Sequence, residues 1–212
     1  MAKLEHLSTT RLPTLWGSFQ MALYLETASG KEHIFLWMGQ LSQEDSPPLV
    51  RIHSECLTGD VFSSLRCDCG QQLQEAMKSI AREGRGAILY LRQEGRGIGL
   101  AAKMRAYALQ DNGLDTVEAN LALGFAADER DFSAAVEILV AVGVNSVRLM
   151  TNNPEKVEAL ENGGIRVVER VSIAPSEHQE NSRYLRTKVE KMRHLISLDV
   201  ASAADAAANN EG

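Results

Sequence analysis

Three cysteines stand close together in the sequence and are the side chains best suited to binding a metal. Ten residues separate Cys56 from Cys67, and one residue separates Cys67 from Cys69. An odd number of thiols makes a poor disulfide framework, and in an intracellular protein such a cluster more often holds a metal ion. Three thiolates suffice for a tetrahedral zinc ion whose fourth position is open to water, as in catalytic sites. The alternative is a closed structural site, for which His53 is the nearest fourth ligand.

A glycine-rich stretch follows a predicted strand and precedes a predicted helix. It reads Gln93-Glu94-Gly95-Arg96-Gly97-Ile98-Gly99. Glycines let a ligand approach the backbone closely, and the N-terminus of a helix offers free N–H groups to an anion. Glu94 can accept two hydrogen bonds from the edge of a guanine base, and Arg96 can pair with phosphate. The alternative is a solvated charged loop, because the stretch matches neither the Walker nor the dinucleotide fingerprint.

Other polar residues stand at the ends of predicted elements. Arg130 lies among three carboxylates, which would orient its guanidinium unless the group is a surface salt-bridge cluster. The stretch Thr151–Lys156 follows a strand and opens a helix, so its hydroxyl, N–H groups and ammonium can converge on phosphates. Ordinary capping of that helix by Asn153 is the alternative. Tyr107 falls on the helix after the glycine-rich stretch, where a core position is the more common role.

The elements that must position these residues alternate between strands and helices. Strands are predicted over residues 16–25, 33–38 and 49–53, and later over 87–91, 147–150 and 165–168. Helices are predicted over 71–83 and 100–110, from a Ser133 cap with Val136, Leu139 and Val140 on one face, from Pro154 to Gly163, and over 184–198. This order predicts an α/β fold in which a mixed sheet with flanking helices is preceded by a short antiparallel β segment.

Composition and charge limit the classes of protein. A chain of 212 residues with 44% hydrophobic and 24% charged residues is typical of a soluble globular protein. We predict one catalytic domain over residues 1–198 and a disordered tail over 199–212. Without a signal peptide or an apolar run of about 18 residues, a cytoplasmic protein that binds no membrane is expected.

The net charge of −6 argues against a nucleic-acid partner. The middle of the chain is nevertheless basic, with nine Lys and Arg but six Asp and Glu between Arg51 and Arg105. This local excess suggests a small anionic ligand, although chance would also produce it.

Six stretches together resemble GTP cyclohydrolase II. They are Arg51–Asp60, Leu65–Gly70, Arg92–Arg96, Arg105–Asp111, Gly124–Phe132 and Thr151–Lys156. Their order and spacing match as well, from about Leu12 to Leu195. The resemblance implies a hydrolase that opens the imidazole ring of GTP and releases formate and pyrophosphate. The product would be 2,5-diamino-6-ribosylamino-4(3H)-pyrimidinone 5′-phosphate, made in the first step of riboflavin biosynthesis.

The resemblance also implies roles for single residues. Cys56, Cys67 and Cys69 would be the zinc ligands, with one ion per subunit of a homodimer. Asp128 would be the proton acceptor, Arg130 the nucleophile, and Tyr107 would take part in the ring chemistry. The GTP contacts would be Arg51, Ile52, His53, Ser54, Glu55, Gln72, Glu94, Gly95, Arg96, Thr116, Thr151 and Lys156, with Mg²⁺ on the triphosphate. Because an arginine pKa lies above about 12, stabilising charge is an easier task for Arg130 than nucleophilic attack.

Several alternatives and departures stay open at this point. Some members of the family are fused to a second domain of the same pathway, but about 50 residues precede the first motif here, so a monofunctional enzyme is predicted. The stretch Ser172–Asn181 and the tail depart from the family pattern, which leaves dimer contacts and loop closure open. A relative that stops at the formamidopyrimidine, or a non-catalytic zinc-containing GTP sensor, is the alternative function.

Overall fold

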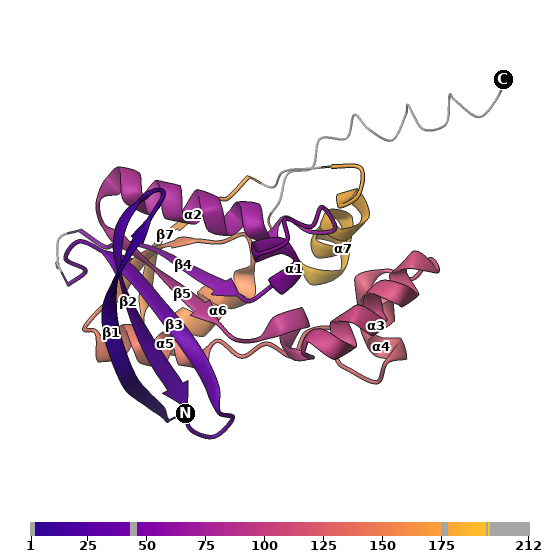
Figure 1. Ribbon diagram of the computed structural model, residues 1–212, viewed down its shortest axis with the longest axis horizontal. Coiled ribbons are helices and arrows are strands. Elements are labelled where there is room, and N and C mark those ends of the chain that lie inside the picture. Colours follow the sequence, from indigo (N-terminus) through magenta and orange to yellow (C-terminus); the bar gives the residue numbers. More distant parts are fainter. Residues whose placement is uncertain (1–2, 43–45, 175–177, 194, 196–212) are drawn as a thin grey trace.

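A seven-stranded mixed sheet forms the centre of the protein in its computed structural model, which describes residues 3–42, 46–174, 178–193 and 195 (Figure 1). Its strands are β1 (Leu4–Thr14), β2 (Gly17–Glu26), β3 (Lys31–Met38), β4 (Leu49–Ser54), β5 (Gly86–Leu91), β6 (Ser146–Met150) and β7 (Arg166–Val171). They lie in the order β1-β2-β3-β5-β4-β6-β7. The tail over residues 199–212 lies outside the described residues. The predicted α/β class with a mixed sheet is confirmed.

The sheet has an antiparallel half and a parallel half. Strands β1, β2 and β3 form an antiparallel meander, and β3 pairs antiparallel with β5. Strand β4, by contrast, is parallel to both β5 and β6, and β6 is parallel to β7. The antiparallel N-terminal segment is therefore confirmed for β2 and β3, but residues 49–54 belong to the parallel half. Burial of all but one β4 residue agrees with a central parallel strand.

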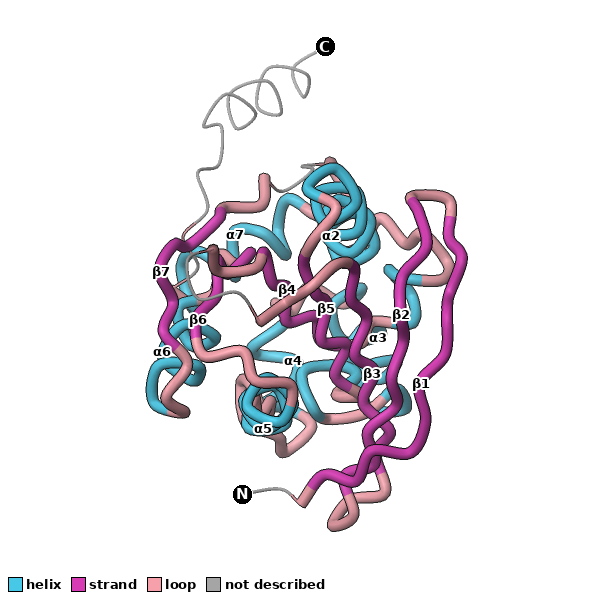
Figure 2. Tube along the Cα trace, turned by 90° about the vertical axis from the view of Figure 1, so that its left-hand side faces the viewer, coloured by secondary structure: helices cyan, strands magenta, loops and turns pink. Residues whose placement is uncertain are grey.

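Helices cover both faces of this sheet. They are α1 (Leu57–Asp60), α2 (Cys69–Glu83), α3 (Leu100–Asp111), α4 (Thr116–Ala122), α5 (Ser133–Ala141), α6 (Pro154–Asn162) and α7 (Ser182–Met192), with a 3₁₀ turn η1 (Glu94–Gly97). Figure 2 shows α2 on one side of the sheet, and α5 and α6 on the other. Two apolar clusters fill these layers: Ile80 of α2 packs in one, and Ile138 and Leu160 of α5 and α6 pack in the other.

Most predicted helix ends agree with the structure, but the start of α5 and the end of α7 differ. Helix α6 begins as predicted, with the Asn153 side chain accepting a hydrogen bond from the Glu155 N–H. The N-cap of α5 is Phe132 rather than Ser133, and Val140 is 56% exposed instead of lying on the core face. Helix α7 ends at Met192, because the next residue adopts a left-handed conformation. None of the helices in the described ranges is long and apolar enough to span a membrane.

The carboxyl ends of the parallel strands bring the candidate site residues together. β4 leads into the segment with Cys56, β5 into the glycine-rich stretch, and β6 into Thr151. Ligands of open α/β sheets bind beyond the carboxyl ends of their strands. Figure 1 shows α3, α4 and α7 grouped beyond this edge of the sheet, so they form the opposite side of the site.

Candidate active site

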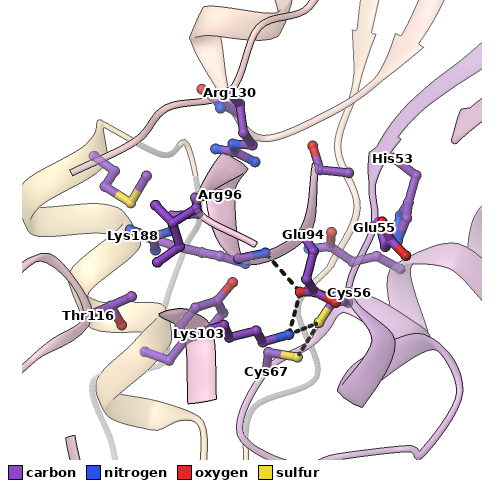
Figure 3. A pocket seen from close by; sticks show the side chains of 18 of the residues that line it. His53, Glu55, Cys56, Cys67, Glu94, Arg96, Lys103, Thr116, Arg130 and Lys188 are labelled. Atoms are coloured by element: carbon purple, nitrogen blue, oxygen red, sulfur yellow. Dashed lines mark hydrogen bonds and ion pairs between the residues drawn. The ribbon is translucent and has the colours of Figure 1, made fainter. Parts of the chain in front are cut away.

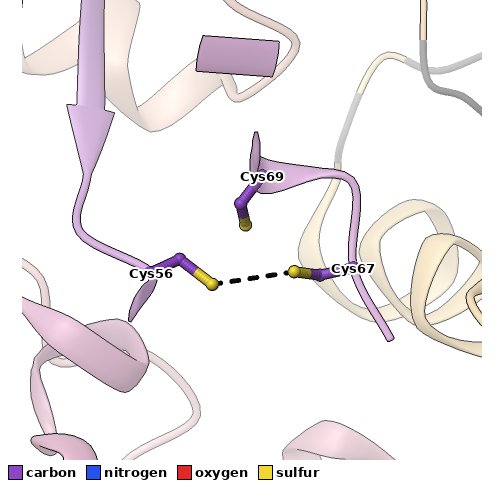
Figure 4. A group of neighbouring side chains, drawn as sticks. All are labelled: Cys56, Cys67 and Cys69. Atoms are coloured by element: carbon purple, nitrogen blue, oxygen red, sulfur yellow. Dashed lines mark hydrogen bonds between the residues drawn. The ribbon is translucent and has the colours of Figure 1, made fainter. Parts of the chain in front are cut away.

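The three thiols predicted to bind a metal converge in the structure. Their Sγ atoms lie within 4.8 Å of one another, and those of Cys56 and Cys67 are 3.6 Å apart (Figure 4). All three cysteines are free of disulfide bonds. A Cβ added at Gly59 would stand 2.9 Å from the Cys67 sulfur and 3.3 Å from the Cys56 sulfur, so glycine leaves the room that the thiols occupy. This donor set and spacing fit a zinc ion.

Close packing of the thiols limits the negative charge that they hold on their own. Hydrogen bonds from Cys67 and Cys69 lower the pKa of the Cys56 thiol. The same hydrogen bond with Cys56 raises the pKa of Cys67 to about 11, and the pKa of Cys69 is raised as well. One thiolate is therefore favoured over three. A bound cation would reverse this balance, since metal binding requires deprotonated ligands.

His53 does not join the cysteines as a fourth ligand but contacts Asp60, which is hydrogen-bonded to the Cys56 backbone. Among the described residues, the metal-capable group around these thiols consists of the cysteines alone. The His53 Nε2 atom lies 3.0 Å from the Asp60 carboxylate, which also accepts hydrogen bonds from the Cys56 N–H and the Tyr90 hydroxyl. The closed structural site with His53 as fourth ligand is thus not formed here. Asp60, which received no role from the sequence, instead fixes the backbone of Cys56.

Lys103 of α3 links the thiols to the glycine-rich stretch (Figure 3). Its Nζ atom donates to the Cys56 sulfur at 3.1 Å and to Glu94 Oε1 at 2.8 Å. The other Glu94 oxygen accepts from the Leu57 N–H at 2.7 Å. Burial lowers the pKa of Lys103, but the charge of Cys56 and the bond to Glu94 outweigh it and raise that pKa. The Glu94 carboxylate, predicted to be open to a guanine edge, is therefore largely engaged with the protein.

Arg96 occupies a strained position in η1. Its φ is 62° and that of Gly95 is 63°, and a left-handed conformation costs a non-glycine residue about 1–3 kcal/mol. Both terminal guanidinium nitrogens of Arg96 are buried and, within the described residues, have no hydrogen-bond partner. A buried cation without an acceptor is costly unless a ligand supplies one. The Arg96 guanidinium is accordingly suited to an anionic ligand.

Two more basic side chains face the same space without full compensation. Lys156 donates from Nζ to the Ile52 carbonyl at 2.9 Å, a neutral partner. Burial lowers the pKa of Lys156 far below its usual value, and the neighbouring charges of Arg51, Arg130 and Lys188 lower it further. Burial likewise lowers the pKa of Arg51 to about 10. So dense a group of positive charges favours a polyanionic ligand.

Arg130 is held by the carboxylate of Asp128. Its Nε donates to Oδ1 at 2.9 Å and its Nη2 donates to Oδ2 at 2.5 Å, a bidentate pair. Burial lowers the pKa of Arg130, but the hydrogen bond and the charge of Asp128 outweigh it, and the net shift is upward. The guanidinium is thereby kept charged and oriented, which favours a role in stabilising negative charge.

Tyr107 lies on the metal side of the cavity. Its hydroxyl is 3.3 Å from Thr58 Oγ1, and the Lys103 ammonium lies 5.5 Å from the centre of its ring. Burial raises the pKa of Tyr107, so the phenol stays protonated near neutral pH. A neutral hydroxyl next to the thiols is able to donate or accept a proton there.

Most of the predicted residues line one cavity that is open to solvent. They are Arg51, His53, Ser54, Glu55, Cys56, Cys67, Cys69, Gln72, Glu94, Gly95, Arg96, Tyr107, Thr116, Arg130, Thr151 and Lys156. Ile52 is fully buried in the apolar core, and Asp128 stands behind Arg130. Lys103, Tyr184 and Lys188 also line the cavity, although no local sequence pattern singles them out.

Known proteins resemble this chain closely. A family model described as GTP cyclohydrolase II matches residues 5–172. A GTP cyclohydrolase-2 of Haemophilus influenzae strain PittEE is 55% identical over 196 residues, which cover 92% of this chain and 91% of that protein. One from Neisseria meningitidis serogroup B is 56% identical over 194 residues, or 92% and 98%. A solved structure of a two-domain 3,4-dihydroxy-2-butanone 4-phosphate synthase from A. baumannii is 19% identical with a TM-score of 0.45, over 81% of this chain and 40% of that one.

Proposed function

The chain belongs to the GTP cyclohydrolase II family, and we propose that it opens the imidazole ring of GTP with zinc bound at Cys56, Cys67 and Cys69. The reaction releases formate and pyrophosphate and leaves 2,5-diamino-6-ribosylamino-4(3H)-pyrimidinone 5′-phosphate, the first step of riboflavin biosynthesis. One observation supports this best: a cluster of thiols and a cluster of buried cations face the same cavity. The thiols suit a metal ion for chemistry on the base, and the cations suit a triphosphate.

The thiols and their supports form the metal end of the site. Zinc bound there supplies a water of lowered pKa as a nucleophile. The protein holds the ligands in place: Asp60 fixes the backbone of Cys56, and Lys103 donates to its sulfur. Tyr107 stands close by and would donate or accept a proton as the ring opens.

Glu94 would contact the base from beside the thiols, because Lys103 donates both to Glu94 and to the Cys56 sulfur. A carboxylate oxygen accepts up to two hydrogen bonds. Among the described residues, Oε2 accepts one, from the Leu57 N–H, which leaves it one site for the guanine edge. The hydrogen bond from Lys103 to Oε1 holds the carboxylate in place.

The cations would hold the triphosphate together with Mg²⁺. Arg96 offers two unpaired guanidinium nitrogens, and Lys156 lies at the N-terminal end of α6, where N–H groups and the helix dipole also favour an anion. The remaining GTP contacts proposed are Arg51, Ile52, His53, Ser54, Glu55, Gly95, Gln72, Thr116 and Thr151. The enzyme is proposed to act as a cytoplasmic homodimer with one zinc ion per subunit.

We assign Arg130 to charge stabilisation at the phosphates rather than to nucleophilic attack. Attack requires a neutral guanidine, and the bidentate bond to Asp128 favours the charged form. Asp128 would therefore orient Arg130 and keep it protonated. Fixed positive charge of this kind lowers the energy of the transition state as pyrophosphate leaves.

The function is tested by incubating the zinc-loaded protein with GTP and Mg²⁺ and measuring formate and pyrophosphate separately. Both products in step, and neither after Cys67→Ser, support the full reaction. Pyrophosphate without formate means that the phosphate end works while the ring chemistry does not. An accumulating formamide indicates a relative that stops at the formamidopyrimidine. Bound GTP with no product at all would place the protein among nucleotide sensors.

A further inference from the structure

Helix α7 lines the cavity although it lies beyond residue 172, where the family model ends. Tyr184, Lys188 and Met192 follow one another at four-residue spacing and all face the cavity. Residues four apart lie on one face of a helix, so the inner face of α7 is a wall of the site. Figure 3 shows Lys188 beside Arg96 and below Arg130.

Lys188 is bonded to the segment that carries two of the thiols. Its Nζ atom donates to Asp68 Oδ1 at 2.6 Å, and Asp68 stands between Cys67 and Cys69. The side chains are 8% and 0% exposed, so this is a buried ion pair with short, direct geometry. The ammonium also lies over the Tyr184 ring, 4.4 Å from its centre. A shift of Asp68 would move the residues on both of its sides.

The Asp68 carboxylate extends this link to the phosphate end of the site. Its Oδ2 atom accepts a hydrogen bond from Gln72 Nε2 at 2.6 Å, and Gln72 Oε1 accepts one from Arg51 Nη2 at 2.5 Å. Lys188, Asp68, Gln72 and Arg51 thus form a row of bonded side chains from α7 through α2 to β4. The row joins the metal end of the cavity to its cationic end.

A second lysine of α7 provides a contrast. Lys191 pairs with Asp115 and with Glu118 of α4, at the surface of the protein and away from the thiols. It is 40% exposed, whereas Lys188 is buried. Both lysines fasten the same helix to an aspartate, but the Lys188 pair alone reaches the metal-binding segment.

We propose that Lys188 is a positioning residue of the metal centre, which fixes the Cys67–Cys69 segment through Asp68 and makes α7 part of the active site. The proposal rests on the proposed function, because it requires zinc at the three thiols. Side chains that orient metal ligands from outside the coordination sphere typically change metal affinity 10- to 100-fold when they are replaced. Loss of Lys188 also leaves Asp68 buried without its counter-charge, so the segment must rearrange to reach water.

The test compares zinc retention in Lys188→Met and Lys191→Met, which remove the same charge from the same helix. The rate of zinc transfer to a chromogenic chelator is measured, together with the thiolate-to-metal absorption of the cobalt-substituted proteins. We expect about 10- to 100-fold faster zinc loss from Lys188→Met, an altered cobalt spectrum, and wild-type behaviour for Lys191→Met. Lys188→Arg should restore retention, because its guanidinium can still reach Asp68. With zinc in excess, kcat should fall more than KM rises.

Four outcomes overturn the proposal. Equal retention in Lys188→Met and wild type refutes it, and equal loss in both lysine variants shows that α7 acts only through its general docking. A wild-type protein that binds no zinc refutes the proposed metal centre together with the role of Lys188. A wild-type protein that binds zinc, with equal retention in Lys188→Met, refutes the role of Lys188 alone. If Lys188→Met does not fold, the double variant Asp68→Asn, Lys188→Met removes both charges, and wild-type retention in that protein also refutes the proposal.

Discussion

Removal of the Lys103 ammonium tests how the metal and base ends of the site are held together. Lys103 and Glu94 form an ion pair whose side chains are 8% and 9% exposed. Replacing Lys103 by Met keeps the apolar stem but leaves Glu94 buried with two backbone N–H donors, from Leu57 and Gly95. Removing one partner of such a pair costs about 3–5 kcal/mol.

For a chain of this length, each kcal/mol lowers Tm by about 2–4 °C. Lys103→Met is therefore expected to unfold about 6–20 °C below the wild type. Calorimetry on the zinc-free proteins measures this without a contribution from the metal. Glu94→Gln in the same chain removes the stranded charge and should recover much of the loss.

A Tm for Lys103→Met within about 2 °C of the wild type would refute the reasoning, because it would mean that Glu94 is solvated and needs no counter-charge. A double variant no more stable than the single one would refute it as well, since the unpaired carboxylate would then not be the cause of the loss.

Two substitutions and one pH dependence test the thiols and the phosphate end of the site. Gly59→Ala places a methyl group 2.9 Å from the Cys67 sulfur, so zinc affinity should fall about ten-fold or more, measured by competition with a chelator. The pKa of Lys156 is lowered in the protein without GTP, and the negative charge of a bound triphosphate would raise it. GTP binding should therefore take up protons. The affinity for GTP should be highest below the Lys156 pKa of the free protein and should decline as pH rises through the Lys156 pKa of the complex. Calorimetry in buffers of different ionisation enthalpy measures that uptake. Arg130→Lys keeps the charge but loses the bidentate bond to Asp128, so pyrophosphate release should slow about 100-fold; a near-normal rate in a stopped assay would exclude both the nucleophilic and the stabilising role.

The parts of the fold that the sequence predicts are those with strong local patterns. The apolar runs of β5 and β6 and the Asn153-Pro154 start of α6 are such cases. The direction of β4 could not be predicted, because an apolar run is equally compatible with a parallel and an antiparallel neighbour. Strand β1 also escaped prediction: most of its side chains are exposed, and it exists through its pairing with β2.

A capping box in the sequence marks the start of helix α4, although no helix was predicted there. Asp115 accepts from the N–H groups of Val117 and Glu118, and Glu118 bonds back to the Asp115 N–H, which is a complete capping box. The spacing of an aspartate three residues before a glutamate is visible in the sequence.

Residues of the site were predictable where they belong to a motif and unpredictable where they act through distant partners. The three cysteines follow from their spacing alone, whereas the substrate contacts followed from the family resemblance. Lys188 and its partner Asp68 are 120 residues apart in the chain. Lys103 likewise reaches Cys56 across 47 residues. Such pairs leave no periodic or local trace, because the fold alone brings them together.

The left-handed backbone of Arg96 places a conformational cost on the folded protein within its candidate active site. Glycine would adopt the same φ without strain, so Arg96→Gly would be more stable and would lose the two guanidinium nitrogens that face the cavity. Selection for stability alone would therefore drive this position toward glycine. With Arg96 holding the triphosphate, as proposed above, ligand binding and fold stability make opposite demands on this position, as happens at sites where stability and activity oppose each other.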